Sequence, residues 1–261
     1  MALHRIESVA KALQILTLFK IDKPEWGVSE IARELGMQKS TVHRLLTTMQ
    51  EYDFVRKNTQ GTHYRLGLRV FELGSVVFST FDLRTVAVSY LHKLSSQCGE
   101  TVHVGVLNDI EVMSIESVET QSALKSTVIV GKRAPLYCTG VGKALLAFLP
   151  IDERDRIIDR IQFQKFTANT ITDRESLVKE LDITRSRGYA IDNMEHEMGV
   201  RCIAAPIWDR TGKVVASLSV SGPSIRITEE RIPELAELVI STTKEISAEL
   251  GAYSHDSYNS S

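Results

Sequence analysis

Residues 28–55 read VSEIARELGMQKSTVHRLLTTMQEYDFV, and the spacing of their apolar residues predicts two short helices in the N-terminal part of the chain. The first half fits a short helix with Ser29 as a candidate N-cap and Gly36 where the helix would stop. The second half has an apolar stripe opposite a hydrogen-bonding face, as in an amphipathic helix. Two helices joined by a short glycine-containing turn are typical of a helix-turn-helix, which sets its second helix into the DNA major groove. The alternative is an ordinary helical hairpin with a solvated outer face.

The segment after the second helix favours the first interpretation. Arg56 and Lys57 are followed by a turn-prone stretch at 58–61 and then by the alternating Tyr64-Arg65-Leu66. This pattern predicts a small hairpin, the wing of a winged helix-turn-helix, which would lie along the phosphate backbone. We expect the basic residues to contact phosphates and the polar residues of the second helix to contact base edges. The candidate DNA-binding residues are Gln38, Lys39, Ser40, Thr41, His43, Arg44, Thr47, Arg56, Lys57 and Arg65.

Composition and charge describe an ordinary soluble protein with two domains. The chain has 261 residues, of which 43% are hydrophobic and 25% charged, and its net charge is −2. The charge is unevenly distributed: residues 1–67 hold 10 Lys and Arg against 7 Asp and Glu, net +3, and the remainder holds 21 against 26, net −5. A mildly basic N-terminal part joined to an acidic remainder suits a DNA-binding domain attached to a domain with another role.

Cysteine usage and hydropathy predict a cytoplasmic protein with no membrane partner. Cys98, Cys138 and Cys202 have no CxxC spacing, so the sequence shows neither a disulfide framework nor a zinc-finger pattern. No apolar run reaches the length of a membrane span, and the N-terminus carries charges where a signal peptide needs its apolar core.

Two helices are predicted on either side of the helix-turn-helix and wing. Before it, Ser8 is a candidate N-cap of a helix that would turn Val9, Leu13 and Leu16 toward the core. After it, apolar residues at 68–82 recur close to the heptad period. Such a helix is either buried within one chain or pairs with a second copy, and its place after the wing favours a linker that makes a dimer. The apolar residues of this linker are Val70, Phe71, Leu73, Val77, Phe78 and Phe81.

The rest of the chain predicts an α+β domain on a mostly antiparallel sheet, because hairpin-joined strands are flanked by helices. Strands are predicted at 101–107, 112–118, 127–130, 189–192, 202–208 and 214–220. Helices are predicted at 83–98, 139–149 and 228–251. Two more are predicted between them: one capped by Asp152, and one that begins at a capping box at 172–175 and ends at Gly188. The domain boundaries we predict are 1–67 for the winged helix-turn-helix, 68–82 for the linker, 83–251 for the second domain and 252–261 for a disordered tail.

Three segments of the second domain place polar groups at the ends of predicted elements. Gly140 and Val141 begin a helix, whose free N–H groups and positive dipole end favour a carboxylate. Asp192 ends a strand and Cys202 lies on the next one, while Ser219 and Ser221 share one face of a third. Close packing of Gly140 and Gly142 against a strand is the structural alternative for the first segment.

Catalysis and metal binding are alternatives that lack a local signature. Cys202 with His103 or His196 and an acid has the composition of a Cys–His nucleophile, and His103, Cys138, Asp192 and Cys202 could hold a metal. However, Cys202 lies among Ile, Ala and Val, where a buried cysteine is usually inert. We therefore expect no enzyme activity, no metal and no cofactor.

Three strings resemble one family across nearly the whole chain, about residues 5–251. They are SEIARELGMQKSTVHRLL at 29–46, PLYCTGVGKALLAFLP at 135–150 and GYAIDNMEHEMGVRCIAAPIWDRTGKVVASLSVSGP at 188–223. They are similar to the IclR family of bacterial transcription regulators, most of all to members that regulate hexuronate or other sugar-acid breakdown. The resemblance implies a winged helix-turn-helix, a linker helix and a C-terminal GAF/profilin-like domain, assembly as dimers or dimers of dimers, and response to small organic acids.

The resemblance also implies an effector site at Gly140, Val141, Asp192, Cys202, Ser219 and Ser221. The chain departs from the family pattern in having Asn193-Met194 where acidic residues are frequent, and Val141 where Ala is frequent. We expect a homo-oligomeric, DNA-binding repressor of a catabolic operon, controlled by a small carboxylate such as a sugar acid or keto acid. The alternatives are a Cys-nucleophile enzyme with a helical interaction module and a ligand-sensing adaptor that binds protein through its winged domain.

Overall fold

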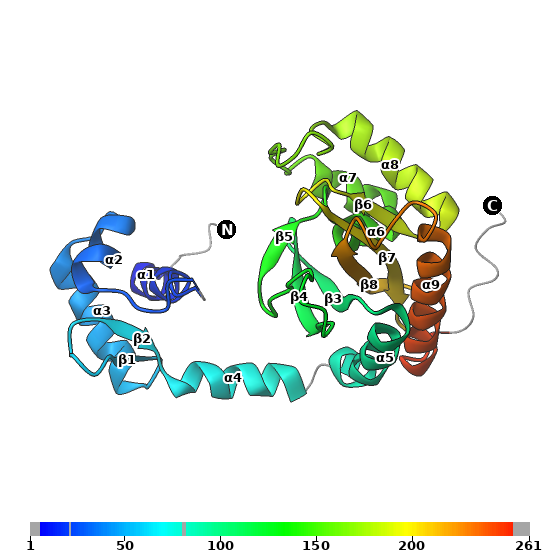
Figure 1. Cartoon of the computed structure of the whole chain (residues 1–261). Helices are drawn as coiled ribbons and strands as arrows, with labels where there is room; N and C mark the ends of the chain where they lie inside the picture. Colours follow the sequence, from blue (N-terminus) through cyan, green and yellow to red (C-terminus); the bar gives the residue numbers. More distant parts are fainter. Residues whose placement is uncertain (1–5, 21, 80–81, 253–261) are drawn as a thin grey trace. The chain divides into compact units, whose positions relative to one another are not determined.

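The chain divides into two compact units, residues 1–81 and 82–261. A computed structural model describes residues 6–20, 22–79 and 82–252, and Figure 1 shows their secondary structure. The predicted tail at 252–261 lies outside the described residues apart from Ala252. None of the described helices has the length and hydropathy that crossing a membrane requires.

The first unit is a winged helix-turn-helix followed by a long helix, as predicted. Its elements are α1 (Glu7–Leu16), α2 (Val28–Glu34), α3 (Lys39–Glu51), β1 (Val55–Lys57), β2 (Tyr64–Leu66) and α4 (Leu68–Ser79). The wing is an antiparallel hairpin that pairs Arg56 with Arg65, and Trp26 forms a further bridge to Tyr64. The core between the helices and the wing contains the fully buried side chains of Ile15, Ile31, Val42, Leu46 and Val55.

Two predicted N-caps in this unit are wrong. Helix α2 begins after Gly27, whose N–H donates to Glu30 Oε2 at 2.8 Å, and Ser29 lies inside the helix. Helix α1 begins after Ile6, so Ser8 is also inside its helix. In α2 a downstream glutamate reaches back to the cap, which makes a capping serine unnecessary. The predicted stop at Gly36 is confirmed, since its φ of +63° suits glycine.

Of the predicted apolar stripe of α1, only Leu16 packs against the core, and Val9 and Leu13 face outward. Val9 and Leu13 are 52% and 57% exposed, whereas the helix buries Ala10 and Ile15. The prediction that Val9 and Leu13 support the core is therefore wrong. Helical periodicity identifies an apolar face, but it does not say what covers that face.

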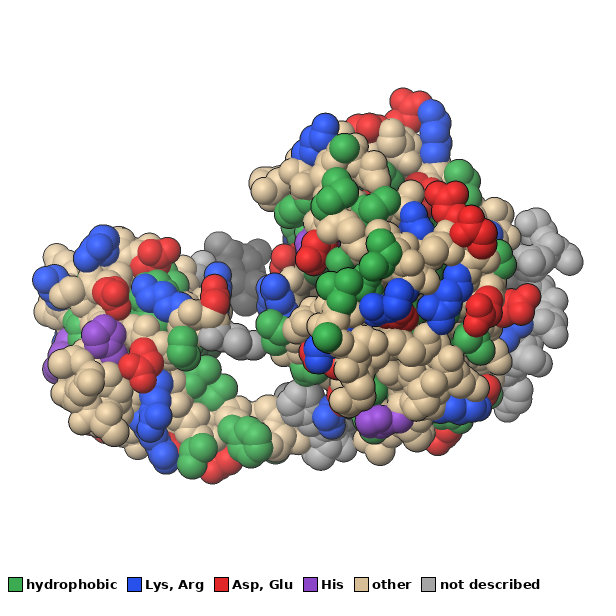
Figure 2. Space-filling model, in the orientation of Figure 1, with side chains coloured by type: hydrophobic (Ala, Val, Ile, Leu, Met, Phe, Trp, Pro, Cys, Tyr) green, Lys and Arg blue, Asp and Glu red, His purple; other side chains and the backbone are tan. Residues whose placement is uncertain are grey.

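Helix α4 confirms the predicted linker helix and is largely exposed. Phe71 is 73% and Val76 61% exposed, and Leu68 and Leu73 are also exposed. Figure 2 shows hydrophobic side chains on the surface along this helix. The side chains of Val77 and Phe78 are not described, and Phe81 lies outside the described residues.

The second unit is an antiparallel sheet covered by helices, which confirms the predicted α+β class. The sheet has six strands in the order β5-β4-β3-β8-β7-β6, and all neighbouring strands are antiparallel. The strands are β3 (Thr101–Asn108), β4 (Glu111–Val118), β5 (Arg133–Pro135), β6 (Ala190–Asn193), β7 (Val200–Trp208) and β8 (Val214–Pro223). The helices are α5 (Asp82–Cys98), α6 (Gly140–Phe148), α7 (Ile151–Ile158), α8 (Arg174–Arg187) and α9 (Ile232–Glu249).

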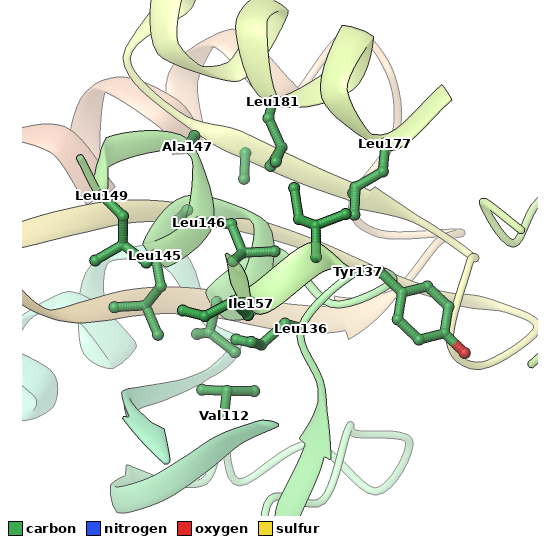
Figure 3. Close-up of a cluster of buried hydrophobic side chains, with 14 of the residues drawn as sticks. Val112, Leu136, Tyr137, Leu145, Leu146, Ala147, Leu149, Ile157, Leu177 and Leu181 are labelled. Atoms are coloured by element: carbon green, nitrogen blue, oxygen red, sulfur yellow. The ribbon is translucent and has the colours of Figure 1, made fainter. Parts of the chain in front are cut away.

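Helices cover both faces of this sheet. Helices α5 and α9 lie side by side on one face (Figure 1), and α6 covers the other face, over β7 and β8. Side chains of α6, α7 and α8 form a core with Leu136 and Val112, as Figure 3 shows. The N-terminus of α6 is thus held directly above the middle strands.

Several predicted boundaries in this unit are wrong. Residues 127–130 form no strand: the chain turns at Gly131, with φ +83°, and strand β5 begins only at Arg133. Helix α8 is capped by Asp173, which accepts from Ser176 N–H, rather than by Thr172. Helix α7 follows Pro150 rather than Asp152, and α9 begins at Ile232. The predicted end of α8 at Gly188 is confirmed.

Candidate functional site

The outer face of α3 is polar and open. Gln38, Lys39, Ser40, His43, Arg44 and Thr47 are exposed and Thr41 is partly exposed. Val42, Leu46 and Met49 are buried on the opposite side of the helix. Because the core uses only the apolar side, the polar side is available to a partner. The Thr47 hydroxyl donates to the His43 carbonyl at 2.9 Å, which fixes its orientation.

The basic residues of the wing are exposed but differ in their partners. Arg56 donates twice to Asp53, at 2.6 and 2.9 Å, and this pairing raises the pKa of Arg56 and lowers that of Asp53. Such an exposed pair is weak and can be exchanged for a phosphate. Among the described residues, no ion pair forms to Lys39, Arg44, Lys57 or Arg65.

The predicted effector residues of the second unit come together on the α6 face of the sheet. Strand pairing sets Asp192 opposite Cys202 and Cys202 opposite Ser221, so β6, β7 and β8 each contribute one member of a row. Ser219 belongs to the next row, opposite Ala204. Residues directly opposite on antiparallel strands point to the same face, so these side chains share one side.

The start of α6 covers these rows at short range. A Cβ added to Gly140 would lie 3.2 Å from Cys202 Cβ and 3.5 Å from Ala204 Cβ, so close packing against β7 is confirmed at this position. The Thr139 hydroxyl caps the helix by accepting from Gly142 N–H at 3.2 Å. Among the described residues, no hydrogen bond is donated by the N–H groups of Gly140 and Val141. Close packing and an anion-binding helix start are therefore compatible.

All six predicted effector residues are buried. Cys202 Sγ lies 3.2 Å from Ser221 Oγ, and Ser221 Oγ donates to Ser126 Oγ at 2.8 Å. Ser126 belongs to the β4–β5 loop, which sequence reasoning did not connect with the site. Its carbonyl also accepts from Thr101 Oγ1 at 2.8 Å, which ties the loop to the sheet.

Asp192 is a buried carboxyl with an altered acidity. It is 3% exposed and accepts from Glu195 N–H at 2.8 Å. Burial, with the nearby Glu195 carboxylate, raises the pKa of Asp192 to about 7. Near neutral pH this carboxyl is therefore partly protonated and can donate a hydrogen bond as well as accept one.

A buried lysine close to Asp192, Lys143, was not predicted from the sequence. Lys143 is 1% exposed, forms an ion pair with Glu195, and lies 3.7 Å from Glu180 Oε1. The second carboxylate oxygen of Glu195 is buried with no hydrogen-bond partner among the described residues. Lys143 is the one charged residue in the α6 sequence GVGKALLAF, and a single charge in an otherwise apolar helix was the available signal.

The residues of the enzyme and metal alternatives are placed less favourably. Burial raises the pKa of both the Cys138 and the Cys202 thiols, which disfavours the thiolate that a nucleophile or a metal requires. The His196 ring packs edge-on against the Phe166 ring, with the two ring centroids 5.0 Å apart, whereas His103 lies on β3 opposite Ser219. The described residues contain no cluster of three His, Cys, Asp or Glu side chains able to hold a metal.

Both units match models of one protein family. Residues 8–59 match the IclR helix-turn-helix domain, and residues 75–248 match the family "Bacterial transcriptional regulator IclR C-terminal". The second match alone covers more than half of the chain.

Individual proteins are similar over almost the whole chain. The HTH-type transcriptional regulator XynR of Escherichia coli is 36% identical, over 94% of this chain and 98% of its own. The HTH-type transcriptional repressor AllR of E. coli is also 36% identical, over 95% and 92%. An IclR homolog from Microbacterium hydrocarbonoxydans, solved in complex with 4-hydroxybenzoate, matches with a TM-score of 0.82 and 25% identity over 94% of this chain and 99% of its own.

The winged helix-turn-helix of the first unit and the antiparallel sheet of the second agree with the two family domains matched at 8–59 and 75–248. They also agree with the family predicted from the three sequence strings. This chain belongs to the IclR family of DNA-binding transcriptional regulators.

Proposed function

We propose that this regulator is a homo-oligomeric repressor that releases its operator when a small carboxylate metabolite binds to the second unit. The first unit contacts DNA through α3 and the wing, and the effector site consists of Gly140, Val141, Asp192, Cys202, Ser219 and Ser221. The protein acts in the cytoplasm, where its DNA lies.

The observation that carries this proposal is the convergence of three distant segments at one place. The α6 start offers two unused N–H groups, and the β8 serines lie on the same side of the sheet. Together the N–H groups and the serine hydroxyls suit a carboxylate, provided that each hydroxyl turns from its present acceptor, the Val220 carbonyl for Ser219 and Ser126 Oγ for Ser221. When ionised, Asp192 accepts from a hydroxyl group; when protonated, it donates to a hydroxyl or keto oxygen. The 4-hydroxybenzoate bound by the Microbacterium relative is also a carboxylate.

Exposed apolar surface on the first unit supports self-association. Ile6, Val9 and Leu13 are exposed at and along α1, and Leu68, Phe71, Leu73 and Val76 are exposed on α4. Large apolar side chains clustered on a surface are typical of protein–protein contacts. Two copies of the chain that associate through these apolar surfaces present two recognition helices, and a palindromic operator requires two.

Control by the effector requires two arrangements of the DNA-binding units. The acid must bind more tightly to the arrangement that fits the operator poorly, because a ligand shifts an equilibrium only by its differential affinity. A ligand with equal affinity for both arrangements would have no effect on repression.

A gel-shift assay with the upstream region of the protein's own gene tests DNA binding, and a thermal-shift screen of sugar acids, keto acids and aromatic acids tests effector binding. We expect a preference for that fragment over random duplex, and release by an acid that raises the melting temperature. Asp192→Ala should abolish release while leaving the DNA complex intact. A monomer with no preference for any promoter fragment would refute the proposal and favour the adaptor alternative.

A further inference from the structure

His103 and Ser117 lie beside the effector site, and neither is among the residues assigned to it. His103 on β3 is opposite Ser219 on one side and opposite Ser117 of β4 on the other. These residues continue the row that includes Ser219 and Ala204, so all of them point to the α6 face of the sheet. Gly105, two residues after His103, confirms this direction, because a Cβ there would lie 3.4 Å from Val141 Cβ.

Both side chains end in polar atoms that lack a hydrogen-bond partner. His103 is 7% exposed, and its Nδ1 is buried without a partner among the described residues. The Ser117 hydroxyl oxygen is buried and unpartnered in the same way. Buried polar groups are almost always paired in native proteins, because an unpaired group costs free energy. Two such groups on neighbouring strands, beside a ligand site, point to a partner that the chain itself does not supply.

The chemistry of the two groups restricts that partner. Burial lowers the pKa of His103 to about 4, so the imidazole is neutral at pH 7, with one nitrogen that donates and one that accepts. A neutral imidazole beside a serine hydroxyl is a poor site for a second carboxylate, since it brings no positive charge. A hydroxyl group fits better, because it can donate to one of the two side chains and accept from the other.

Strand spacing sets the distance between this hydroxyl and the carboxylate. Ser219 and Ser221 lie on β8, His103 on the adjacent β3 and Ser117 on β4 beyond it. Neighbouring strands are about 4.8 Å apart, so the hydroxyl lies about 5–10 Å from a carboxylate held at β8. A hydroxyl on the carbon next to the carboxylate cannot span that distance.

We propose that His103 and Ser117 form a hydroxyl-binding subsite of the effector site, so that this regulator selects acids with a hydroxyl distant from the carboxylate over acids that lack one. This inference rests on the proposed effector site and adds its specificity. Discrimination of this kind is strong when a site is built to hydrogen-bond a hydroxyl, since the acid that lacks it leaves polar groups unpaired.

The test uses the full-length protein and six-carbon acids that differ in their hydroxyls. The probes are hexanoate, 2-hydroxyhexanoate, 4-, 5- and 6-hydroxyhexanoate, and gluconate, measured by isothermal titration calorimetry. We expect at least one acid with a distant hydroxyl to bind about tenfold or more tightly than hexanoate and 2-hydroxyhexanoate.

Variants assign that preference to the two side chains. His103→Leu and Ser117→Ala should each remove the preference while changing hexanoate affinity by less than about threefold. His103→Asn, which keeps a polar atom near the Nδ1 position, should restore part of it. His92→Leu, at an exposed histidine of α5, is the matched control and should behave like the unaltered protein. Operator binding without any acid reports whether each variant is folded.

The outcomes separate this inference from the proposed function. If hexanoate binds and no distant hydroxyl improves its affinity, the subsite is refuted while the carboxylate site stands. If the preference exists but persists in both His103→Leu and Ser117→Ala, the subsite assignment is wrong. If none of the acids binds to the unaltered protein, the effector site and the subsite both fail.

Discussion

At the scale of single residues, the second unit buries charged side chains, and each buried charge needs a partner of opposite charge or a hydrogen bond. Lys143 is enclosed between α6 and the β6–β7 loop, where Glu195 neutralises it. The Thr170 hydroxyl donates to the Glu195 carbonyl at 2.6 Å, so the loop that carries this carboxylate is itself held in place. Asp192 lies next to this pair, and its burial, together with the nearby Glu195 carboxylate, raises its pKa.

Replacing Asp192 with Asn should stabilise the protein at neutral pH. The carboxyl loses its proton near pH 4 in the unfolded chain but near 7 in the folded one, so the folded state is progressively destabilised as pH rises between these values. Above that window the cost is constant, at most about 4 kcal/mol. We therefore expect Asp192→Asn to raise the melting temperature at pH 8 by several degrees and to have little effect at pH 4.5, as measured by thermal denaturation. A gain of equal size at both pH values would contradict the raised pKa.

Gly142→Ala should destabilise the second unit, because this position has no room for a side chain. An added Cβ would lie 2.5 Å from the Leu136 Cα and 2.7 Å from its carbonyl carbon. Both are backbone atoms that cannot rotate away, so α6 would have to shift, at a cost of about 1–3 kcal/mol. Urea denaturation measures the loss. Gly74→Ala is the control, since the space around Gly74 in α4 is open and alanine favours a helix by about 0.5–1 kcal/mol there.

At the scale of elements, α1 and α4 are amphipathic helices whose apolar faces are only partly covered by their own unit. The same periodicity that correctly predicted these helices led to the wrong direction for Val9 and Leu13. An exposed groove along α1 is lined by the apolar Ile6, Val9, Ala10 and Leu13 and by the polar Gln14 and Thr17. The proposed function requires a second copy of this chain, and we expect that copy to bind in this groove.

Leu13→Glu should weaken self-association without unfolding the protein. Leu13 is 57% exposed, so the charge is solvated in a monomer but would be buried in a dimer formed through α1. Sedimentation velocity should show a shift from dimer toward monomer at micromolar concentration, with an unchanged melting profile when dilute. Ser8→Glu, on the opposite side of the helix, should leave the dimer intact. Equal behaviour of the two variants would exclude α1 from the interface.

At the scale of the whole molecule, charge is divided between the units. The net charge is −2, although the first 67 residues carry a net charge of +3. Figure 2 shows Lys and Arg side chains on the surface of both units. The presence of basic side chains on a surface is therefore not enough to identify the surface that binds DNA. Operator binding should nevertheless depend steeply on salt, because phosphate contacts by α3 and the wing release counterions.

Arg44→Ala should weaken operator binding while leaving effector binding unchanged. Arg44 is exposed on α3 and has no ion pair among the described residues, so it is free to contact DNA. We expect operator affinity to fall about 5- to 100-fold and the salt dependence to decrease by about one counterion per protomer. Fluorescence anisotropy at several salt concentrations measures both. Arg160→Ala, which removes an exposed arginine of the second unit, should change neither; an equal loss there would show that the effect is only one of total charge.

Local sequence patterns are enough to predict the winged helix-turn-helix, the linker helix, the antiparallel α+β domain and the family. Hydrophobic periodicity and turn residues are local properties, so they can be read without knowing what packs against them. The residues of the proposed effector site were also predictable, because Asp192 and the β8 serines resemble a family pattern.

Which faces are buried and which side chains meet depends on how distant segments pack together. Strand order places His103 beside Ser219, although 116 positions separate them in the sequence. The β4–β5 loop places Ser126 within hydrogen-bonding distance of Ser221. Packing of α6 against β7 enclosed Lys143 with Glu195, a pairing that helical spacing does not encode. Burial, pairing and pKa depend on contacts between distant segments, and these contacts exist only once the chain has folded.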